Sequence, residues 1–250
     1  ASASEELEFL FILQARQARI KSASFIDIWS NYKIRFIYNG NNVFPDTILS
    51  IDDKCTEEMV EDGIPADLIQ EIGQPYLEDI CKIIPPLGKK ILLPIQPIKK
   101  IRGNSLGYDE YDFLRVTLDA LNNTKIEDEI FITGHPDGDF SYTKQSSISI
   151  GAGKGLTDIK DAHTVLGMYS MQMIVAYLWG RRVASVQPDL KITDPSPLSR
   201  WGFVPIIQDS QKLIEFMEQP IDNNGREGII MKIVGSQNRF NNYLLQEVES

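Results

Sequence analysis

The spacing of apolar residues predicts an amino-terminal helix followed by a hairpin. Apolar side chains recur at helical spacing over residues 9–20, and glutamates precede them where a helix begins. Residues 32–38 roughly alternate apolar and polar positions and end at Asn39-Gly40, a pair that favours a tight turn between antiparallel strands. We expect residues 43–51 to form the partner strand.

Further along, the pattern predicts short helices and short strands. The helices are expected at residues 56–61, 65–72, 75–84, 108–121, 210–218 and 240–248. The strands are expected at residues 130–133, 146–150 and 228–234, and residues 203–207 are expected to be extended. Residues 91–98 are also extended, but Pro94 and Pro97 argue against a central strand there.

The most apolar segment of the chain, residues 165–179, lies inside a stretch that we predict to be one long buried helix over residues 157–182. Because strands and helices do not alternate regularly, the predicted fold class is α+β, helix-rich, with short mixed strands. We expect a single domain over residues 1–250. A possible internal boundary falls near residues 85–90, where two prolines and a glycine interrupt the pattern.

Composition indicates an ordinary globular protein. Hydrophobic residues make up 42% and charged residues 24% of 250 residues, which leaves enough apolar surface for a large core. The two cysteines, Cys55 and Cys81, form no disulfide framework and no zinc cluster. These features predict a soluble protein in the cytoplasm or another reducing compartment, without a membrane span.

Charge is distributed unevenly along a chain whose net charge is −10. Residues 85–103 contain five basic side chains and no acidic one, and residues 141–205 contain seven basic and four acidic side chains. Acidic stretches surround both basic segments. We interpret the two segments as candidate surfaces for a polyanion, against the alternative that the charges are simply scattered.

The segment SSISIGAGKGLTDIK is the best candidate for an anion site. A strand, a glycine loop and a helix start bring backbone N–H groups and positive charge together, with Gly151, Gly153, Gly155, Lys154 and Lys160 as the expected contacts. The loop matches neither the GxxxxGK[ST] nor the GxGxxG nucleotide motif. The alternative is a turn whose glycines only supply positive φ angles.

The segment GHPDGDF offers His135, Asp137 and Asp139 as candidate metal ligands. Alternate residues of an extended strand face one side, so the three side chains can converge on a divalent ion. The same letters also describe a β-turn, which we favour because no second ligand cluster is present. No cofactor is therefore predicted from this segment.

Two further segments, KKIRGNS and REGIIMK, together resemble motifs of the polynucleotide ligases, a family of covalent nucleotidyltransferases. That resemblance implies Lys100 as the nucleophile, Glu227 on a strand beside a Mg²⁺ ion, and Lys232 near phosphate. It covers about fourteen residues, and Arg102 stands where the family has an aspartate. A neighbouring Lys99 would lower the pKa of a lysine nucleophile.

Arginines beside tryptophans are the last candidates. Arg181 and Arg182 follow Trp179, and Arg200 precedes Trp201, the combination with which single-stranded nucleic acid is bound. The arginines also suit a helix carboxyl end, which is a sufficient structural explanation.

Two functions follow from these patterns. The preferred one is a non-enzymatic, nucleoprotein-like binding or assembly protein that contacts a phosphate-bearing polyanion, most plausibly single-stranded RNA, and that can form homo-oligomers. The alternative is a metal-dependent, nucleotidyltransferase-like enzyme with Lys100, Glu227 and Mg²⁺. The predicted polyanion contacts are Lys99, Lys100, Arg102, Gly151, Gly153, Lys154, Gly155, Lys160, Arg181, Arg182 and Arg200.

Overall fold

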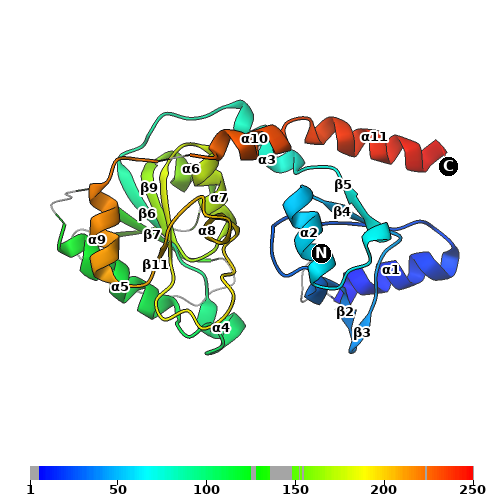
Figure 1. The fold of residues 1–250 in the computed structure, drawn as a ribbon, viewed down its shortest axis with the longest axis horizontal. Helices are drawn as coiled ribbons and strands as arrows, with labels where there is room; N and C mark the ends of the chain where they lie inside the picture. Colours follow the sequence, from blue (N-terminus) through cyan, green and yellow to red (C-terminus); the bar gives the residue numbers. More distant parts are fainter. Residues whose placement is uncertain are drawn as a thin grey trace. The chain divides into compact units, whose positions relative to one another are not determined.

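The structure, a computed structural model of the 250-residue chain, describes residues 6–124, 128–135, 148–151, 153, 155–222 and 224–249. The chain forms two compact units (Figure 1). Ala1–Lys82 and Gly228–Ser250 make up the first unit, and Ile83–Glu227 make up the second. Each unit has a parallel sheet and an apolar core of its own.

The first unit is built on a three-stranded parallel sheet in the order β1-β4-β5. Its strands are β1 (Ala23–Phe25), β4 (Thr47–Ser50) and β5 (Ile69–Glu71), joined by α2 (Asp53–Glu61) and two 3₁₀ turns, Lys33–Phe36 and Ala66–Leu68. Helix α1 (Glu6–Ala18) packs its Phe9 and Ile12 against Val43. The predicted turn at Asn39-Gly40 joins β2 (Ile37–Tyr38) to β3 (Asn41–Asn42), with positive φ at both turn residues. The predicted partner strand over residues 43–51 is wrong, because β4 within it pairs with β1 and β5 instead.

The carboxyl-terminal helix belongs to this first unit. Helix α11 (Ser236–Glu249), which follows α10 (Arg226–Ile233), lies against α3 (Pro75–Lys82). The Glu78 carboxylate on α3 accepts hydrogen bonds from the backbone N–H groups of Gly235 and Gln237, both 2.7 Å long. A carboxylate in this position satisfies otherwise unpaired N–H groups and suits the positive end of the helix.

The second unit contains a six-stranded sheet in the order β11-β10-β9-β6-β7-β8, with every neighbouring pair parallel. The strands are β6 (Lys90–Pro94), β7 (Glu129–Thr133), β8 (Ile148–Gly151), β9 (Ala162–Gly167), β10 (Arg182–Val186) and β11 (Ile206–Ile207). The helices are α4 (Ile98–Arg102), α5 (Glu110–Asn122), α6 (Leu156–Lys160), α7 (Met171–Leu178), α8 (Pro197–Arg200) and α9 (Ser210–Glu218).

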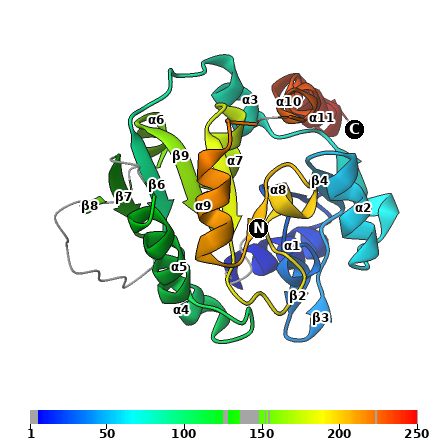
Figure 2. The ribbon, with the colours of Figure 1, turned by 60° about the vertical axis from the view of Figure 1, so that its left-hand side comes forward.

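Helices cover both faces of this sheet. Helices α5 and α9 lie side by side on one face, and α6 and α7 lie on the other (Figures 1 and 2). Alternate strand residues such as Ile91, Leu93 and Leu166 pack on Phe113 and Leu213 of the α5–α9 layer. A parallel sheet buried on both faces gives nearly continuous apolar strands, as in ILLP of β6.

The fold-class prediction is therefore wrong, because the protein is an α/β protein and not helix-rich α+β. The predicted long helix over residues 157–182 is in fact a helix, strand, helix and the first residue of another strand: α6, β9, α7 and Arg182 of β10. A doubly covered parallel strand has no polar face, so its apolar run cannot be distinguished from a buried helix by periodicity.

Two other element predictions are also corrected. Strand β6 is central, between β9 and β7. Pro94 is tolerated because it is the last residue of β6 and lies beyond Leu92, where the pairing with β9 ends. Residues 228–234, predicted as a strand, lie in helix α10 and the residue after it.

Candidate functional site

The strand order of the second unit defines one special point on the sheet. The chain builds outward from β6 through β7 to β8, and then from β9 through β10 to β11 on the opposite side. The loops that follow the adjacent strands β6 and β9 therefore diverge. In open parallel sheets, ligands bind in the crevice that such diverging loops leave at the carboxyl ends of the strands.

A crevice of about 190 Å³ is present at this point. We call it the carboxyl-end crevice. Its lining comes from the ends of β6 and β7 and from residues that follow β6, β7, β8 and β9. The lining residues are Pro94, Ile95, Gln96, Thr133, Gly134, His135, Gly153, Gly155, Ser170 and Gln172. The described walls leave room for a small polar group rather than for a whole nucleotide, since pockets enclosing whole ligands span roughly 300–1,000 Å³.

Two polar side chains at the start of α7 line the crevice and have buried ends. Ser170 occupies the cap position of the helix but makes no capping hydrogen bond. Its Oγ, and the Oε1 atom of Gln172, are buried and have no hydrogen-bond partner among the described residues. Buried polar atoms are almost always paired in folded proteins, so these atoms mark where a polar ligand atom would be accommodated.

Hydrogen bonds hold the loops around the crevice in place. The Tyr169 N–H donates to Gln96 Oε1 at 3.2 Å and so joins the loop after β9 to the loop after β6. Farther along the sheet, Gln187 is fully buried, accepts from the Tyr108 hydroxyl at 3.0 Å and donates to Asp194 at 2.6 Å. Burial raises the pKa values of Tyr108 and Tyr169, so both hydroxyls are neutral hydrogen-bonding groups near pH 7.

The structure brings some predicted site residues into this crevice. Gly153 and Gly155 of the predicted anion loop and His135 of the predicted metal segment all line it. Gly153 has φ +67°, and a Cβ there would lie 2.9 Å from the Gly134 carbonyl oxygen, so the close approach of the two loops requires glycine. Gly151 is the last residue of β8. Lys154, Asp137 and Asp139 lie outside the described residues.

The two basic segments are each divided between opposite ends of the sheet. Lys89 and Lys90 lie at the amino end of β6, whereas Lys99, Lys100 and Arg102 lie on α4 beyond its carboxyl end. The five residues of β6 separate the groups by about 13 Å along the strand, at roughly 3.3 Å per residue. Among the described residues, the predicted contacts therefore do not form one cationic groove.

Three of the predicted contacts have structural partners. Arg181 is 1% exposed and donates to the Pro86 carbonyl at 2.7 Å. Arg182 donates to the Phe216 carbonyl at 2.7 Å, and Arg200 donates to the Asp194 carbonyl at 3.0 Å. These guanidinium groups hold loops together, a role that the sequence pattern does not distinguish from nucleic-acid contact.

The ligase-like motifs do not have the geometry that the resemblance implies. Glu227 lies in the first turn of helix α10, where the family requires a strand. Lys100 lies on the short helix α4. Among the described residues, no cluster of three or more histidine, cysteine or acidic side chains is arranged to bind a metal ion.

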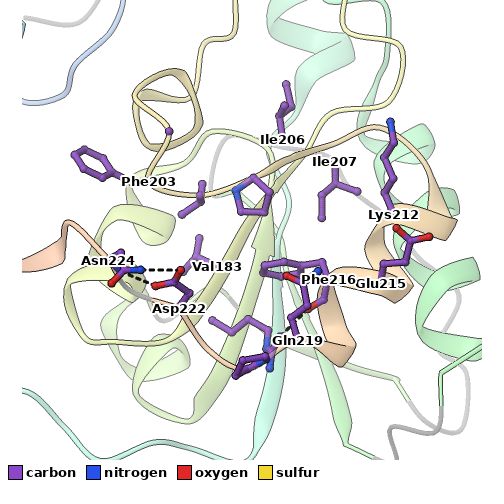
Figure 3. Close-up of a pocket in the computed structure, with 15 residues that line it drawn as sticks. Val183, Phe203, Ile206, Ile207, Lys212, Glu215, Phe216, Gln219, Asp222 and Asn224 are labelled. Atoms are coloured by element: carbon purple, nitrogen blue, oxygen red, sulfur yellow. Dashed lines mark hydrogen bonds between the residues drawn. The ribbon is translucent and has the colours of Figure 1, made fainter.

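A roomier pocket of about 580 Å³ lies beside α9, around the start of β10 and the residues leading into β11 (Figure 3). Arg182 in its wall is already bonded to the Phe216 carbonyl, and Asn224 donates to Asp222. This pocket lies away from the carboxyl ends of β6 and β9. The strand-order argument therefore does not apply to it.

Known structures share this fold, although no protein-family model matches the sequence and no curated protein is similar to it in sequence. The UDP-N-acetylglucosamine 2-epimerase of Rickettsia bellii superimposes with a TM-score of 0.62 at 13% identity, covering 96% of this chain and 71% of the epimerase. The UDP-GlcNAc 2-epimerase of Neisseria meningitidis, solved bound to UDP-GlcNAc, gives 0.60 at 14% identity, with coverages of 95% and 73%.

A third structure, Anabaena HepE in complex with UDP and glucose, gives a TM-score of 0.59 at 11% identity, covering 98% of this chain and 76% of that protein. These similarities, together with the strand order, show that the chain has a Rossmann-type α/β fold, which it shares with these structures.

The prediction of an RNA-binding nucleoprotein is therefore wrong. Several structures that share its fold are UDP-GlcNAc 2-epimerases or were solved with UDP bound. Arg181 and Arg200, which were proposed to contact RNA, instead donate to backbone carbonyls of neighbouring loops. The phosphate-bearing ligands of two of these structures are UDP-GlcNAc and UDP, and neither is a nucleic acid. Among the described helices, none has the length and apolar character needed to cross a membrane.

Sequence reasoning missed Gln96, Ser170 and Gln172 in the crevice. None of them belongs to a recognisable motif. They become neighbours only because β6 and β9 are adjacent, and strand order is not a local property of sequence.

Proposed function

We propose that the protein is an enzyme that binds a nucleoside-diphosphate sugar, with its diphosphate in the carboxyl-end crevice. One observation carries the proposal: the loops that follow β6, β7, β8 and β9 all reach the single crevice at the point where the strand order reverses. The UDP-sugars and UDP found with structures of the same fold identify the candidate ligand class.

The chemistry of the lining supports a polar, phosphate-bearing ligand. Helix α7 is eight residues long, and the positive end of its dipole lies at its amino end, beside Ser170. The hydroxyl of Ser170 and the amide of Gln172 supply hydrogen-bonding groups. Gly134, Gly153 and Gly155 present no side chain, so a ligand can approach the backbone closely.

His135 is the titratable side chain among the described lining residues. An imidazole can donate or accept a proton near pH 7 or bind a phosphate oxygen. We therefore assign His135 to ligand contact, and we extend the proposal to turnover of a UDP-sugar without specifying whether the sugar is epimerised or transferred. A reducing compartment, as predicted from the two cysteines, is compatible with such an enzyme.

Gly134 offers a direct test. A Cβ at this position would meet no atom within 4 Å, and its φ is not in the left-handed region, so Gly134→Leu fills the crevice without straining the backbone. Gly228→Leu is the matched control, because Gly228 is exposed, equally open and outside the crevice. Calorimetric titration with UDP and UDP-GlcNAc should show binding that falls at least about tenfold in Gly134→Leu and is unchanged in Gly228→Leu.

Turnover is measured separately by incubating the protein with UDP-GlcNAc and analysing UDP release and sugar configuration. Failure of the unaltered protein to bind any nucleoside diphosphate or its sugar would refute the proposal. So would binding that Gly134→Leu leaves intact.

A further inference from the structure

A second candidate site lies at the opposite end of the same sheet. Residues 86–90, which lead into β6, and Lys160 and Asp161, which lead into β9, line a pocket of about 370 Å³. We call it the lysine pocket, because Lys89, Lys90 and Lys160 all belong to its lining. Here the two basic segments of the sequence do meet, at three of their lysines.

The backbone of the lysine pocket is closely held. Asp161 O accepts from the N–H groups of Lys89 at 2.9 Å and Lys90 at 3.1 Å, and Ala162 O accepts from Gly88 at 3.2 Å. A Cβ on Gly88 would lie only 2.0 Å from the Asp161 carbonyl group. The two wall segments therefore stay in contact, and the positions from which Lys89 and Lys160 project are constrained.

Positive charge exceeds negative charge around the lysine pocket. Lys89 and Lys160 are exposed, and neither has an ion-pair partner in the part of the chain that the structure describes. Lys90 is 3.5 Å from Glu129 Oε2 and is neutralised by it. Asp161 contributes one carboxylate to the lining, against the two ammonium groups of Lys89 and Lys160.

Arg181 adds a buried charge directly behind the pocket wall. Its Nη2 donates to the carbonyl of Pro86 at 2.7 Å and, more weakly, to that of Lys160 at 3.5 Å, so it clasps both wall segments. The side chain is 1% exposed, and its Nε is buried without a hydrogen-bond partner among the described residues. The acceptors of its Nη2 are carbonyl oxygens and not carboxylates. A buried charge without a counter-ion is costly, and burial accordingly lowers the Arg181 pKa.

We propose that the lysine pocket binds a phosphate group, with Lys89 and Lys160 contacting its oxygens and Arg181 adding positive potential from behind. Ammonium groups pair with phosphate oxygens, and an anion here offsets the uncompensated Arg181 charge. The site is independent of the carboxyl-end crevice, because β6 and β9 separate the two.

The phosphate can come from a solute or from a lipid headgroup, and the rim of the pocket makes the second source worth testing. Leu87 of the lining is 54% exposed, and Ile83 and Ile84, three and two residues before the first lining residue Pro86, are 79% and 46% exposed. Exposed apolar side chains next to lysines are the composition with which proteins contact anionic lipid surfaces.

The experiment has two arms. The first is a calorimetric titration with inorganic pyrophosphate in low salt, and the second is co-sedimentation with vesicles of phosphatidylcholine containing phosphatidic acid. The pocket variant Lys89→Glu/Lys160→Glu is compared with Lys191→Glu/Lys212→Glu, which changes net charge equally at exposed positions of the same unit. The variants also carry Gly134→Leu, so that pyrophosphate in the carboxyl-end crevice does not contribute.

We expect the pocket variant to lose at least about tenfold in affinity in one or both arms, and the control pair to change less than about twofold. The arm that responds identifies the source of the phosphate. The proposal is overturned if neither probe binds the protein, or if both variant pairs weaken binding equally. UDP binding is measured separately with Lys89→Glu/Lys160→Glu in a protein that keeps Gly134. That measurement reports on the carboxyl-end crevice alone, so the two proposals fail independently.

Discussion

Replacing Gly88 with alanine should destabilise the second unit, for a reason that the structure makes quantitative. A Cβ at Gly88 would lie 2.0 Å from both the carbon and the oxygen of the Asp161 carbonyl, whereas ordinary contact begins near 3.4 Å. The obstacle is backbone at the junction of β6 and β9, and not the end of a flexible side chain. The two segments must therefore move apart by about 1.4 Å.

That displacement puts three backbone hydrogen bonds at risk, those donated by Gly88, Lys89 and Lys90. At about 0.5–1.5 kcal/mol each, their loss costs about 1.5–4.5 kcal/mol. The reduced freedom of the unfolded chain returns about 0.4–1 kcal/mol when glycine becomes alanine. We therefore expect Gly88→Ala to lower the free energy of unfolding by about 0.5–4 kcal/mol.

Gly134→Ala is the matched control for Gly88→Ala, since neither glycine lies in the left-handed region and the Cβ at Gly134 meets nothing within 4 Å. The control should be neutral, or more stable by up to about 1 kcal/mol. Urea denaturation followed by circular dichroism and tryptophan fluorescence measures both variants. If the two curves coincide within about 0.5 kcal/mol, the close approach at Gly88 does not constrain the fold and the reasoning is refuted.

Further predictions concern the first unit. Asp52 caps α2 by accepting a hydrogen bond from the Cys55 N–H at 2.8 Å, and it also accepts one from the Trp29 indole at 3.0 Å. In urea denaturation, Asp52→Ala should therefore lower the free energy of unfolding by about 1–3 kcal/mol. Asp52→Asn keeps an acceptor and should lower it less. Burial raises the Asp52 pKa above 3.8, so the folded state holds this proton more tightly than the unfolded state does. The free energy of unfolding should therefore fall as pH rises from about 3.8 through the raised pKa. This pH dependence should disappear in Asp52→Asn. Burial raises the pKa of the Cys55 thiol to about 12, so iodoacetamide at pH 8 should leave Cys55 unmodified in the folded protein; rapid labelling, read by mass spectrometry, would contradict its burial.

Local elements of this fold are readable from the sequence where the signal is local. Helix α9 has the bounds that the pattern predicts, and the Asn39-Gly40 turn joins two strands because both residues accept positive φ. The helix predicted at residues 108–121 corresponds to α5, whose start is fixed by the Asp109 capping box.

Elements that depend on burial from both sides are not readable in this way. Strand β9 and helix α7 are both largely buried, and Gly167 at the end of β9 and Ser170 before α7 were not enough to predict a break in the pattern. Pro94 appeared incompatible with a central strand, yet it occupies the last position of one. In both cases the missing information is which strands are neighbours.

The same limit applies to the candidate site. That the glycines at positions 153 and 155 lie between a strand and a helix could be predicted, because a strand and a helix start are local features. That this loop meets Gln96 and Ser170 follows only from the strand order. Charge counting likewise gave the composition of the basic segments, but not the division of residues 85–103 between the two ends of β6.

The return of the carboxyl-terminal helix to the first unit has a consequence for biosynthesis. The second unit is one continuous stretch of chain, so all of its strands are synthesised before α11 is made. The first unit, in contrast, cannot close until Glu78 meets the backbone of Gly235 and Gln237, and Tyr243 reaches the core beside Leu49 and Ile72. The first unit thus begins synthesis before the second but is completed after it, and until then Leu49 and Ile72 lack the cover that Tyr243 supplies.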